Sequence, residues 1–257
     1  MIKGVVMESK AYKVILIIAD ISGYTRYMLS NRTALVHGQV IITELTKTIM
    51  EQIEIPLEIS KLEGDAVFAY AVKGDSESAW EEVKRSTGAK LIKFLSVFSE
   101  KVEELSVSNI CDCNACNNVE MLKLKVIVHS GEALFYRIGK FNELSGVDVI
   151  TVHKLLKNSV NADQYVLLTE PAFAELEFPE KEQLVMGEER YEDLGSIKTF
   201  TYLLPGEEND PDKCKQNPRH ASTLIKAKNA AIKMMNTWQI KFGLKKLPEF
   251  KNLPGTQ

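Results

Sequence analysis

The feature that most restricts the fold is an apolar segment near the N-terminus that ends in a carboxylate. Residues 12–20, YKVILIIAD, are almost all aliphatic or β-branched up to Asp20, and a turn-forming stretch with Ser22, Gly23 and Thr25 follows at once. A short continuous apolar run of this kind, bounded by turn residues, is typical of a strand that is buried on both faces. We therefore expect a central strand whose C-terminal end presents Asp20.

Helical and strand patterns alternate after this segment. Apolar residues recur at helical spacing in two long stretches, and short apolar runs broken by glycine indicate hairpins. The expected elements are a helix over 36–53, strands over 57–62 and 66–72 joined at Gly64 and Asp65, a helix over about 80–105 with Asp75 or Ser76 as its N-cap, and strands over 122–129 and 132–138 joined at Gly131. With the first strand, this order predicts a ferredoxin-like α+β fold, β-α-β-β-α-β, in which an antiparallel sheet carries helices on one face.

The remaining chain extends this domain and adds a tail. The patterns indicate a helix over 149–160 and strands over 165–168 and 198–204. Residues 205–220 are rich in proline and charged side chains, which is typical of an exposed linker. Residues 221–257 contain seven lysines and one glutamate, with apolar residues on one helical face. We expect a domain over 10–204, a linker over 205–220 and a C-terminal helical tail over 221–257.

Composition excludes several classes of protein. The 257 residues are 45% hydrophobic and 26% charged, which favours a folded chain, and the net charge of −3 argues against sequence-independent binding of nucleic acid. The apolar run over 14–19 is too short to span a membrane or to form a signal peptide. The four cysteines do not suggest a disulfide scaffold, because three lie in one hexapeptide. We expect a protein of the cytoplasm with no membrane span.

Two carboxylates are expected to meet at one edge of the sheet. In a ferredoxin-like sheet the first strand lies antiparallel to the third, so the end that carries Asp20 meets the start that follows Asp65. Two converging carboxylates repel each other unless a cation lies between them, and paired divalent metals with oxygen ligands are typical of phosphoryl chemistry. Taken singly, Asp20 could instead cap the next helix and Asp65 could serve the hairpin turn.

The segments around Asp20 and Asp65 resemble motifs of a known family. The segment IIADISGYT is similar to the first metal-binding motif of class III adenylyl and guanylyl cyclases, and KLEGDAVFAY is similar to the second. The later stretches VHSGEALFYRIG and LSGVDVITVHKLL resemble the strand, hairpin and helix that complete the site in that family. The resemblance covers about residues 14–168 and is nearest to an uncharacterised bacterial branch of cyclase homology proteins.

The resemblance implies a two-metal site for a nucleoside triphosphate. Two Mg²⁺ or Mn²⁺ ions would be bound by two carboxylates and a backbone carbonyl, a turn would lie near the phosphates, and a lysine with an acidic partner would recognise a purine base. The matching positions are Asp20, Asp65 and the Ile21 carbonyl for metal, Gly23, Tyr24 and Thr25 for phosphate, and Lys61 and Glu143 for the base. The family assembles such sites in head-to-tail homodimers, so a homodimer is expected. Lys61 could also be an ordinary strand lysine and Glu143 an ordinary loop glutamate.

Two positions depart from the family pattern on the helix after Gly146. Ile150 stands where the family has an asparagine that orients the ribose, and Lys154 stands where it has an arginine that stabilises the transition state. Isoleucine cannot donate a hydrogen bond, and lysine lacks the two-pronged guanidinium that spans an α-phosphate. Lys154 is the candidate for neutralising the charge that develops during catalysis. His153 and Lys157 nearby could compensate, or could be ordinary surface residues of the helix.

A cysteine-rich hexapeptide provides a second candidate site. Cys111, Cys113 and Cys116 lie in the sequence CDCNAC, a density of soft ligands that is compatible with structural zinc. Cys214, His129 or His220 could supply a fourth ligand after folding, as could a partner chain. Three reduced thiols with no metal are the competing interpretation.

These observations predict a metal-dependent nucleotidyl cyclase-like protein. Its reaction would convert a nucleoside triphosphate, with ATP favoured, to a 3′,5′-cyclic nucleotide and pyrophosphate. The competing hypothesis is a cyclase fold that binds a nucleotide or a partner and signals without turnover, which Ile150 and Lys154 favour. A third is a zinc-dependent interaction module formed by the cysteine loop.

Overall fold

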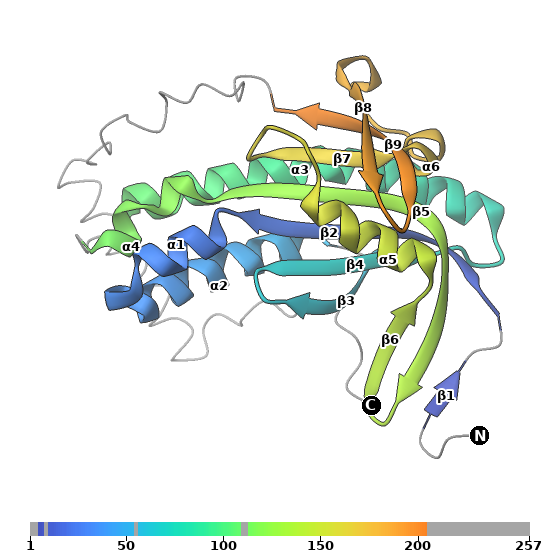
Figure 1. The fold of residues 1–257 in the computed structure, drawn as a ribbon, viewed down its shortest axis with the longest axis horizontal. Coiled ribbons are helices and arrows are strands. Elements are labelled where there is room, and N and C mark those ends of the chain that lie inside the picture. Colours follow the sequence, from blue (N-terminus) through green and yellow to red (C-terminus); the bar gives the residue numbers. More distant parts are fainter. Residues whose placement is uncertain (1–4, 8–9, 54–55, 109–112, 205–257) are drawn as a thin grey trace, which may run out of the picture.

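The computed structural model describes residues 5–7, 10–53, 56–108 and 113–204 (Figure 1). Residues 205–257, which hold the expected linker and tail helix, lie outside the described residues. The main strands and helices are β1 (Val5–Met7), β2 (Tyr12–Ser22), α1 (Tyr24–Ser30), α2 (Leu35–Gln52), β3 (Glu58–Glu63), β4 (Ala66–Val72), α3 (Glu77–Ser108), α4 (Asn114–Asn117), β5 (Lys123–Ile138), β6 (Phe141–Ser145), α5 (Val147–Lys154), β7 (Tyr165–Thr169), α6 (Glu170–Glu175), β8 (Val185–Tyr191) and β9 (Gly195–Leu203). Short 3-10 turns accompany them at Arg32–Ala34, Val119–Met121, Leu155–Lys157 and Lys181–Gln183.

The strands form one sheet within the described residues. Its order is β3-β4-β2-β5-β7-β9-β8, with β1 and β6 also paired to β5. The pairs are antiparallel except for β5 and β7, which run parallel. When the short elements β1, α1 and α4 are left aside, β2, α2, β3, β4, α3 and β5 follow the β-α-β-β-α-β order that the sequence predicts. The α+β fold class is confirmed.

Strand β2 is central because both of its faces are apolar. Residues 14–19 are each at most 1% exposed. Ile15, Ile17 and Ala19 belong to the core on one face, and Val14, Leu16 and Ile18 belong to the core on the other. Since burying one large aliphatic side chain contributes roughly 1.5 to 3 kcal/mol, this segment is stable only inside the sheet.

Helices lie on both faces of the sheet. The long helices α2 and α3 pack on the first core, through residues such as Leu45 and Phe94. The short helix α5 packs on the second core through Val152 and lies in front of the sheet in Figure 1. The long helices therefore share one face, as expected, while α5 closes the opposite face.

The prediction of a hairpin turn at Gly131 is wrong. Strand β5 runs through this position without a turn, and Gly131 pairs with Val14 of β2. The turn lies further on, at Gly139 with φ +59°, and β6 is the returning strand. A Cβ atom at position 131 would lie 2.2 Å from Cγ of Asp148, so this glycine permits the close approach of α5 and does not form a turn.

Candidate functional site

Asp20 and Asp65 lie at the same end of neighbouring strands. In the antiparallel ladder between β2 and β4, Asp20 pairs with Ala66, so Asp65 lies one residue before the pair. Gly64, with φ +69°, forms the turn of the β3–β4 hairpin immediately before Asp65. The apolar segment that ends at Asp20 and the tight hairpin thus bring the two carboxylates to one edge of the sheet.

The electrostatics of Asp65 show that the two carboxylates act on each other. Burial, together with the nearby Asp20 carboxylate, raises the pKa of Asp65 to about 6. The Lys125 ammonium opposes this rise in the pKa. A pair of this kind carries more negative charge at neutral pH than its surroundings compensate, which favours a bound cation.

Lys125 is a charged member of this site that sequence reasoning missed. It pairs with Asp20 across β2 and β5, and its Nζ lies 2.9 Å from Oδ2 of Asp20 and 3.1 Å from the carbonyl oxygen of Leu156. Both side chains are largely buried, at 20% and 18% exposed. Only the register between the two antiparallel strands could have revealed this neighbour.

The turn after Asp20 is fixed by a glycine. Gly23 has φ +83°, and a Cβ atom there would lie 2.8 Å from the carbonyl oxygen of Met121. Tyr24 and Thr25 begin helix α1 directly after it. The Ile21 side chain is buried, so only the backbone of Ile21 is available to this edge of the sheet.

Lys61 and Glu143 meet although 82 residues separate them. Lys61 Nζ donates to Oε2 of Glu143 at 2.9 Å and lies 3.5 Å from Oε1 of Glu63. The hydrogen bond to Glu143 raises the pKa of Lys61, so the ammonium stays charged. His153 of α5 joins this cluster through its Nε2, 3.1 Å from Oε2 of Glu63. The structure thus brings together the two residues that the sequence singled out for base recognition.

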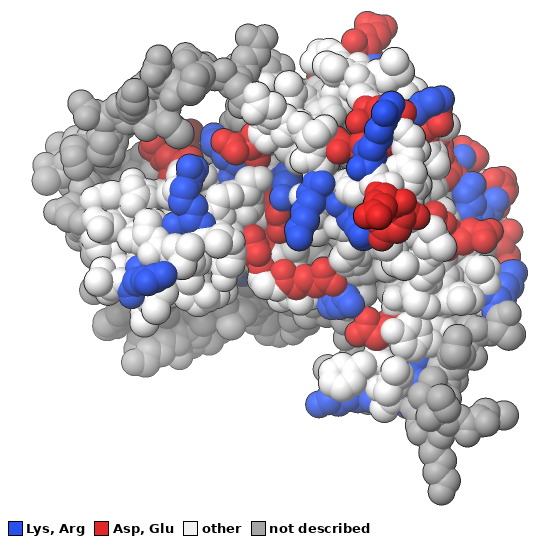
Figure 2. All heavy atoms as spheres, in the orientation of Figure 1, with Lys and Arg blue, Asp and Glu red and all other residues white. Residues whose placement is uncertain are grey.

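Lys154 and Ile150 lie on α5, and both face outward. Nζ of Lys154 is held 2.8 Å from Oδ2 of Asp193, which lies between β8 and β9. The side chain of Ile150 is 52% exposed. Figure 2 shows acidic and basic side chains interspersed over the face that carries α5 and the β3–β4 hairpin.

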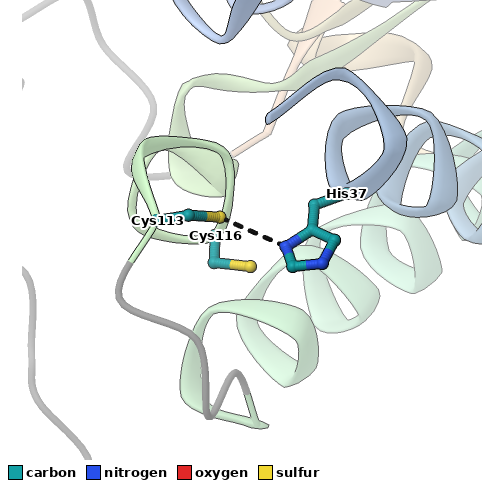
Figure 3. Close-up of side chains that lie close together, drawn as sticks. All are labelled: His37, Cys113 and Cys116. Carbon is teal, nitrogen blue, oxygen red and sulfur yellow. Dashed lines mark hydrogen bonds between the residues drawn. The ribbon is translucent and has the colours of Figure 1, made fainter. Parts of the chain in front are cut away.

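The structure gives the cysteine cluster a ligand that we did not expect. Cys113 and Cys116 face His37 of α2, while Cys111, Cys214 and His220 lie outside the described residues (Figure 3). His129 is engaged elsewhere, since its two ring nitrogens lie 2.8 Å from Oγ1 of Thr169 and 2.9 Å from Oδ1 of Asp148. The sequence patterns do not single out His37 as a ligand.

An open cleft lies at the other end of the sheet. It has a volume of about 590 Å³ and is lined by Lys13, Ser130 and Glu175 among others. Seven residues of β2 separate Lys13 from Asp20, which is about 23 Å along a strand. This cleft therefore does not belong to the Asp20 and Asp65 site.

Sequence comparison links the chain to proteins without assigned activity. A family described as "Protein of unknown function (DUF2652)" matches residues 42–165. The "Uncharacterized protein Rv2561/Rv2562" of Mycobacterium tuberculosis is 31% identical over 114 residues, which are 44% of this chain and 50% of that protein. The chain thus spans half the length of this curated relative.

Structural comparison defines the class of the fold. A bacterial light-regulated adenylyl cyclase matches with a TM-score of 0.56 and 13% identity over 86% of this chain and 58% of that one. The adenylyl cyclase CyaB from P. aeruginosa matches with a TM-score of 0.50 and 13% identity over 79% of this chain and 100% of that one. The chain therefore has a fold of the class III adenylyl and guanylyl cyclase type. In the part of the chain that the structure describes, no helix is long and apolar enough to cross a membrane.

Proposed function

We propose that this protein binds a nucleoside triphosphate with divalent metal and converts it to a 3′,5′-cyclic nucleotide and pyrophosphate. The observation that carries the proposal is the shared edge of Asp20 and Asp65, where burial and then the Asp20 carboxylate raise the pKa of Asp65. The cyclase-like fold supports it, because Asp20 lies near the C-terminal end of β2 and Asp65 directly precedes β4, in the two segments that resemble the family's metal-binding motifs.

The donor set suits Mg²⁺ or Mn²⁺. Two carboxylates and the Ile21 carbonyl are hard oxygen ligands, which these ions prefer. Lys125 supplies one positive charge against two carboxylates, so the group retains about one negative charge when both are ionised. When bound, two such ions would lower the pKa of the attacking hydroxyl and neutralise the triphosphate.

The chain's own residues would position the nucleotide. A metal ion held by Asp20 would compete with the Lys125 ammonium for this carboxylate, and an ammonium released from it would be available to attract phosphate oxygens. The turn at Gly23 would bring the backbone of Tyr24 and Thr25 close to them. Lys61, held charged by Glu143, would donate to an acceptor on the base while Glu143 accepts from a base amino group, which favours adenine.

We propose that the site forms between two copies of the chain in a head-to-tail homodimer, with the carboxylates from one protomer and the base-recognising pair from its partner. Exposed apolar side chains support an interface beside the Lys61 cluster. Leu62 is 51%, Phe141 62% and Val147 67% exposed. Phe141 lies on the β5–β6 hairpin, which extends away from the rest of the sheet in Figure 1. Contiguous exposed apolar residues are typical of protein interfaces, so an interface that covers these three residues is part of the proposal.

The second candidate function is nucleotide binding without turnover. The exposed Ile150 and the engagement of Lys154 by Asp193 favour it. An isoleucine cannot orient a ribose hydroxyl, and a lysine places one charge where a guanidinium would place two donors. Loss of a preorganised charge donor of this kind lowers turnover by about 10²-fold or more.

Product analysis distinguishes these functions. The purified protein is incubated with each of the four ribonucleoside triphosphates and Mn²⁺, and cyclic products are sought by mass spectrometry. We expect cyclic nucleotide from wild type and from Asp75→Asn, which alters an exposed aspartate near the opposite end of the sheet, and none from Asp20→Ala or Asp65→Ala. Metal-dependent binding of intact triphosphate without product would support the second function. The absence of both triphosphate binding and cyclic product would refute both functions.

A further inference from the structure

Three soft metal ligands converge between helices α2 and α4. Nδ1 of His37 lies 3.4 Å from Sγ of Cys113, and the ligand atoms of His37, Cys113 and Cys116 all lie within 4.8 Å of one another. Figure 3 shows the imidazole pointing toward the two sulfur atoms from a different helix. Residues 76 positions apart are thus brought together by the packing of α2 against α4.

The separation of these atoms matches tetrahedral zinc. Zn–S bonds of about 2.3 Å and Zn–N bonds of about 2.0 Å at a tetrahedral angle place nitrogen and sulfur about 3.5 Å apart. The His37 and Cys113 atoms are 3.4 Å apart, close to this distance, and the Cys116 sulfur lies within 4.8 Å of both. We propose that His37, Cys113 and Cys116 bind a structural Zn²⁺ ion. The proposal does not depend on the nucleotide site.

The chemistry of the ligands selects the metal. Two thiolates and an imidazole favour zinc over Mg²⁺ or Mn²⁺, which prefer oxygen. Cys116 is buried and Cys113 half-buried, which suits a structural site that excludes most water. Three protein ligands leave one position of a tetrahedral zinc site, which water would occupy.

The ion would fix the segment that supports the turn after Asp20. The Tyr27 hydroxyl of α1 donates to the carbonyl oxygen of Ala115, between the two cysteines, at 2.9 Å. Further along the same segment, the Met121 carbonyl lies against Gly23. Zinc would thus tie α4 to α2 while existing contacts tie α4 to α1.

Metal analysis of the full chain tests the proposal. Protein purified without chelator is measured for zinc by mass spectrometry, together with His37→Ala, Cys113→Ser and the control His153→Ala, which removes a histidine from a different cluster. We expect about one zinc per chain in wild type and in the control, and a more than tenfold weaker affinity in the other two. His37 is exposed, so its replacement removes a ligand without opening the core.

Cobalt substitution makes the test independent of the variants' folding. Adding Co²⁺ to metal-free wild type should produce a near-ultraviolet charge-transfer band from thiolate ligands, and zinc should abolish it. Absence of both zinc and this band in wild type would refute the proposal. So would undiminished zinc affinity in His37→Ala, or a Cys113–Cys116 disulfide that persists when zinc is offered under mild reduction.

Discussion

Among single residues, Lys125 is the one with which a divalent metal would compete for the Asp20 carboxylate. Its ammonium lies 2.9 Å from the Asp20 carboxylate, so it partly compensates the charge that a divalent ion would neutralise. A metal has two charges and a lysine has one, and a carboxylate pair attracts the divalent ion more strongly. The proposed metal would therefore have to compete with this ion pair, and its higher charge favours it in that competition.

The raised pKa of Asp65 makes stability depend on pH in a defined direction. Its pKa is about 6 in the folded chain and 3.8 when unperturbed, so the folded state binds more protons between these values and stability falls as pH rises through them. Asp65→Asn removes the free-energy cost of keeping this carboxylate ionised in the folded chain. In metal-free protein we expect the variant to be more stable than wild type at pH 8 by up to about 2 kcal/mol, a figure reduced for partial exposure, and no more stable at pH 3.5.

Thermal denaturation in chelator at both pH values measures this difference. Adding Mn²⁺ at pH 8 should raise the melting temperature of wild type more than that of Asp65→Asn, because the ion replaces repulsion with coordination. A variant that is less stable than wild type at pH 8 in chelator would contradict the assigned environment of Asp65.

Restoring the family residues on α5 should increase turnover. Ile150→Asn supplies a hydrogen-bond donor, and Lys154→Arg supplies two donors on one planar group. We expect the double variant to form cyclic nucleotide roughly 10- to 100-fold faster than wild type, with Lys198→Arg on β9 as the matched surface control. Initial rates measured under saturating triphosphate provide the comparison. Equal rates in all three proteins would show that these positions do not limit catalysis.

Residues at strand ends could be predicted, whereas their cross-strand neighbours could not. Asp20 and Asp65 were identifiable because an apolar run and a glycine turn mark the ends of their strands. Lys61 and Glu143 were found only through the family resemblance, and the structure places them in contact. Lys125 and His37 were missed, because their proximity to the sites depends on strand register and helix packing, which no local pattern encodes.

At the scale of elements, strand β5 shows why glycine is an ambiguous signal. The sequence suggests a turn at Gly131, but β5 is one strand of 16 residues that runs through this position. The glycine allows α5 to pack closely against the strand. The main chain of Glu132 donates to Oδ2 of Asp148 at 2.7 Å across this contact. A glycine required by a neighbouring helix and one required by a turn look the same in sequence.

Gly131→Ala should therefore be destabilising. The added Cβ would lie 2.2 Å from Cγ of Asp148, which forces α5 away from β5 and weakens the Asp148 contacts. We expect a loss of about 1 to 3 kcal/mol in the free energy of unfolding, measured by denaturant titration. Gly74→Ala is the matched control, because nothing lies within 4 Å of the position of its Cβ. Equal stability of the two variants would contradict the packing described for α5.

Strand β8 was missed for a related reason. Most of its seven residues are exposed, so no apolar alternation marks it, and it lies at the edge of the sheet. Its position is set by pairing with β9 and not by burial of its own side chains. Central strands such as β2 and β4 were predictable because burial determines their composition.

At the scale of the whole molecule, the proposed head-to-tail homodimer can be tested by complementation. Asp65→Asn lacks a metal ligand and Lys61→Met lacks the base-recognising cation, so each should be inactive alone. In a dimer whose sites combine the two residues from opposite protomers, an equal mixture should recover about one quarter of wild-type activity, since half of the dimers carry one intact site of two. The cyclase assay of separate and mixed proteins, after subunit exchange, measures this recovery.

A control identifies the interface. Phe141→Glu on the β5–β6 hairpin should shift the dimer to monomer in sedimentation, whereas Val185→Glu, a similarly exposed apolar position on β8, should not. If the mixture stays inactive although wild type is active and dimeric, the two residues do not serve one shared site.

The most direct test of the account is calorimetric titration of a non-cleavable ATP analogue into the protein with Mn²⁺ or with chelator. If Asp20 and Asp65 jointly hold the metal that carries the triphosphate, wild type will bind the analogue only with Mn²⁺, and both Asp20→Asn and Asp65→Asn will lose this binding by at least tenfold. Binding of equal strength in chelator, or undiminished Mn²⁺-dependent binding in both variants, would contradict the assignment of these two carboxylates.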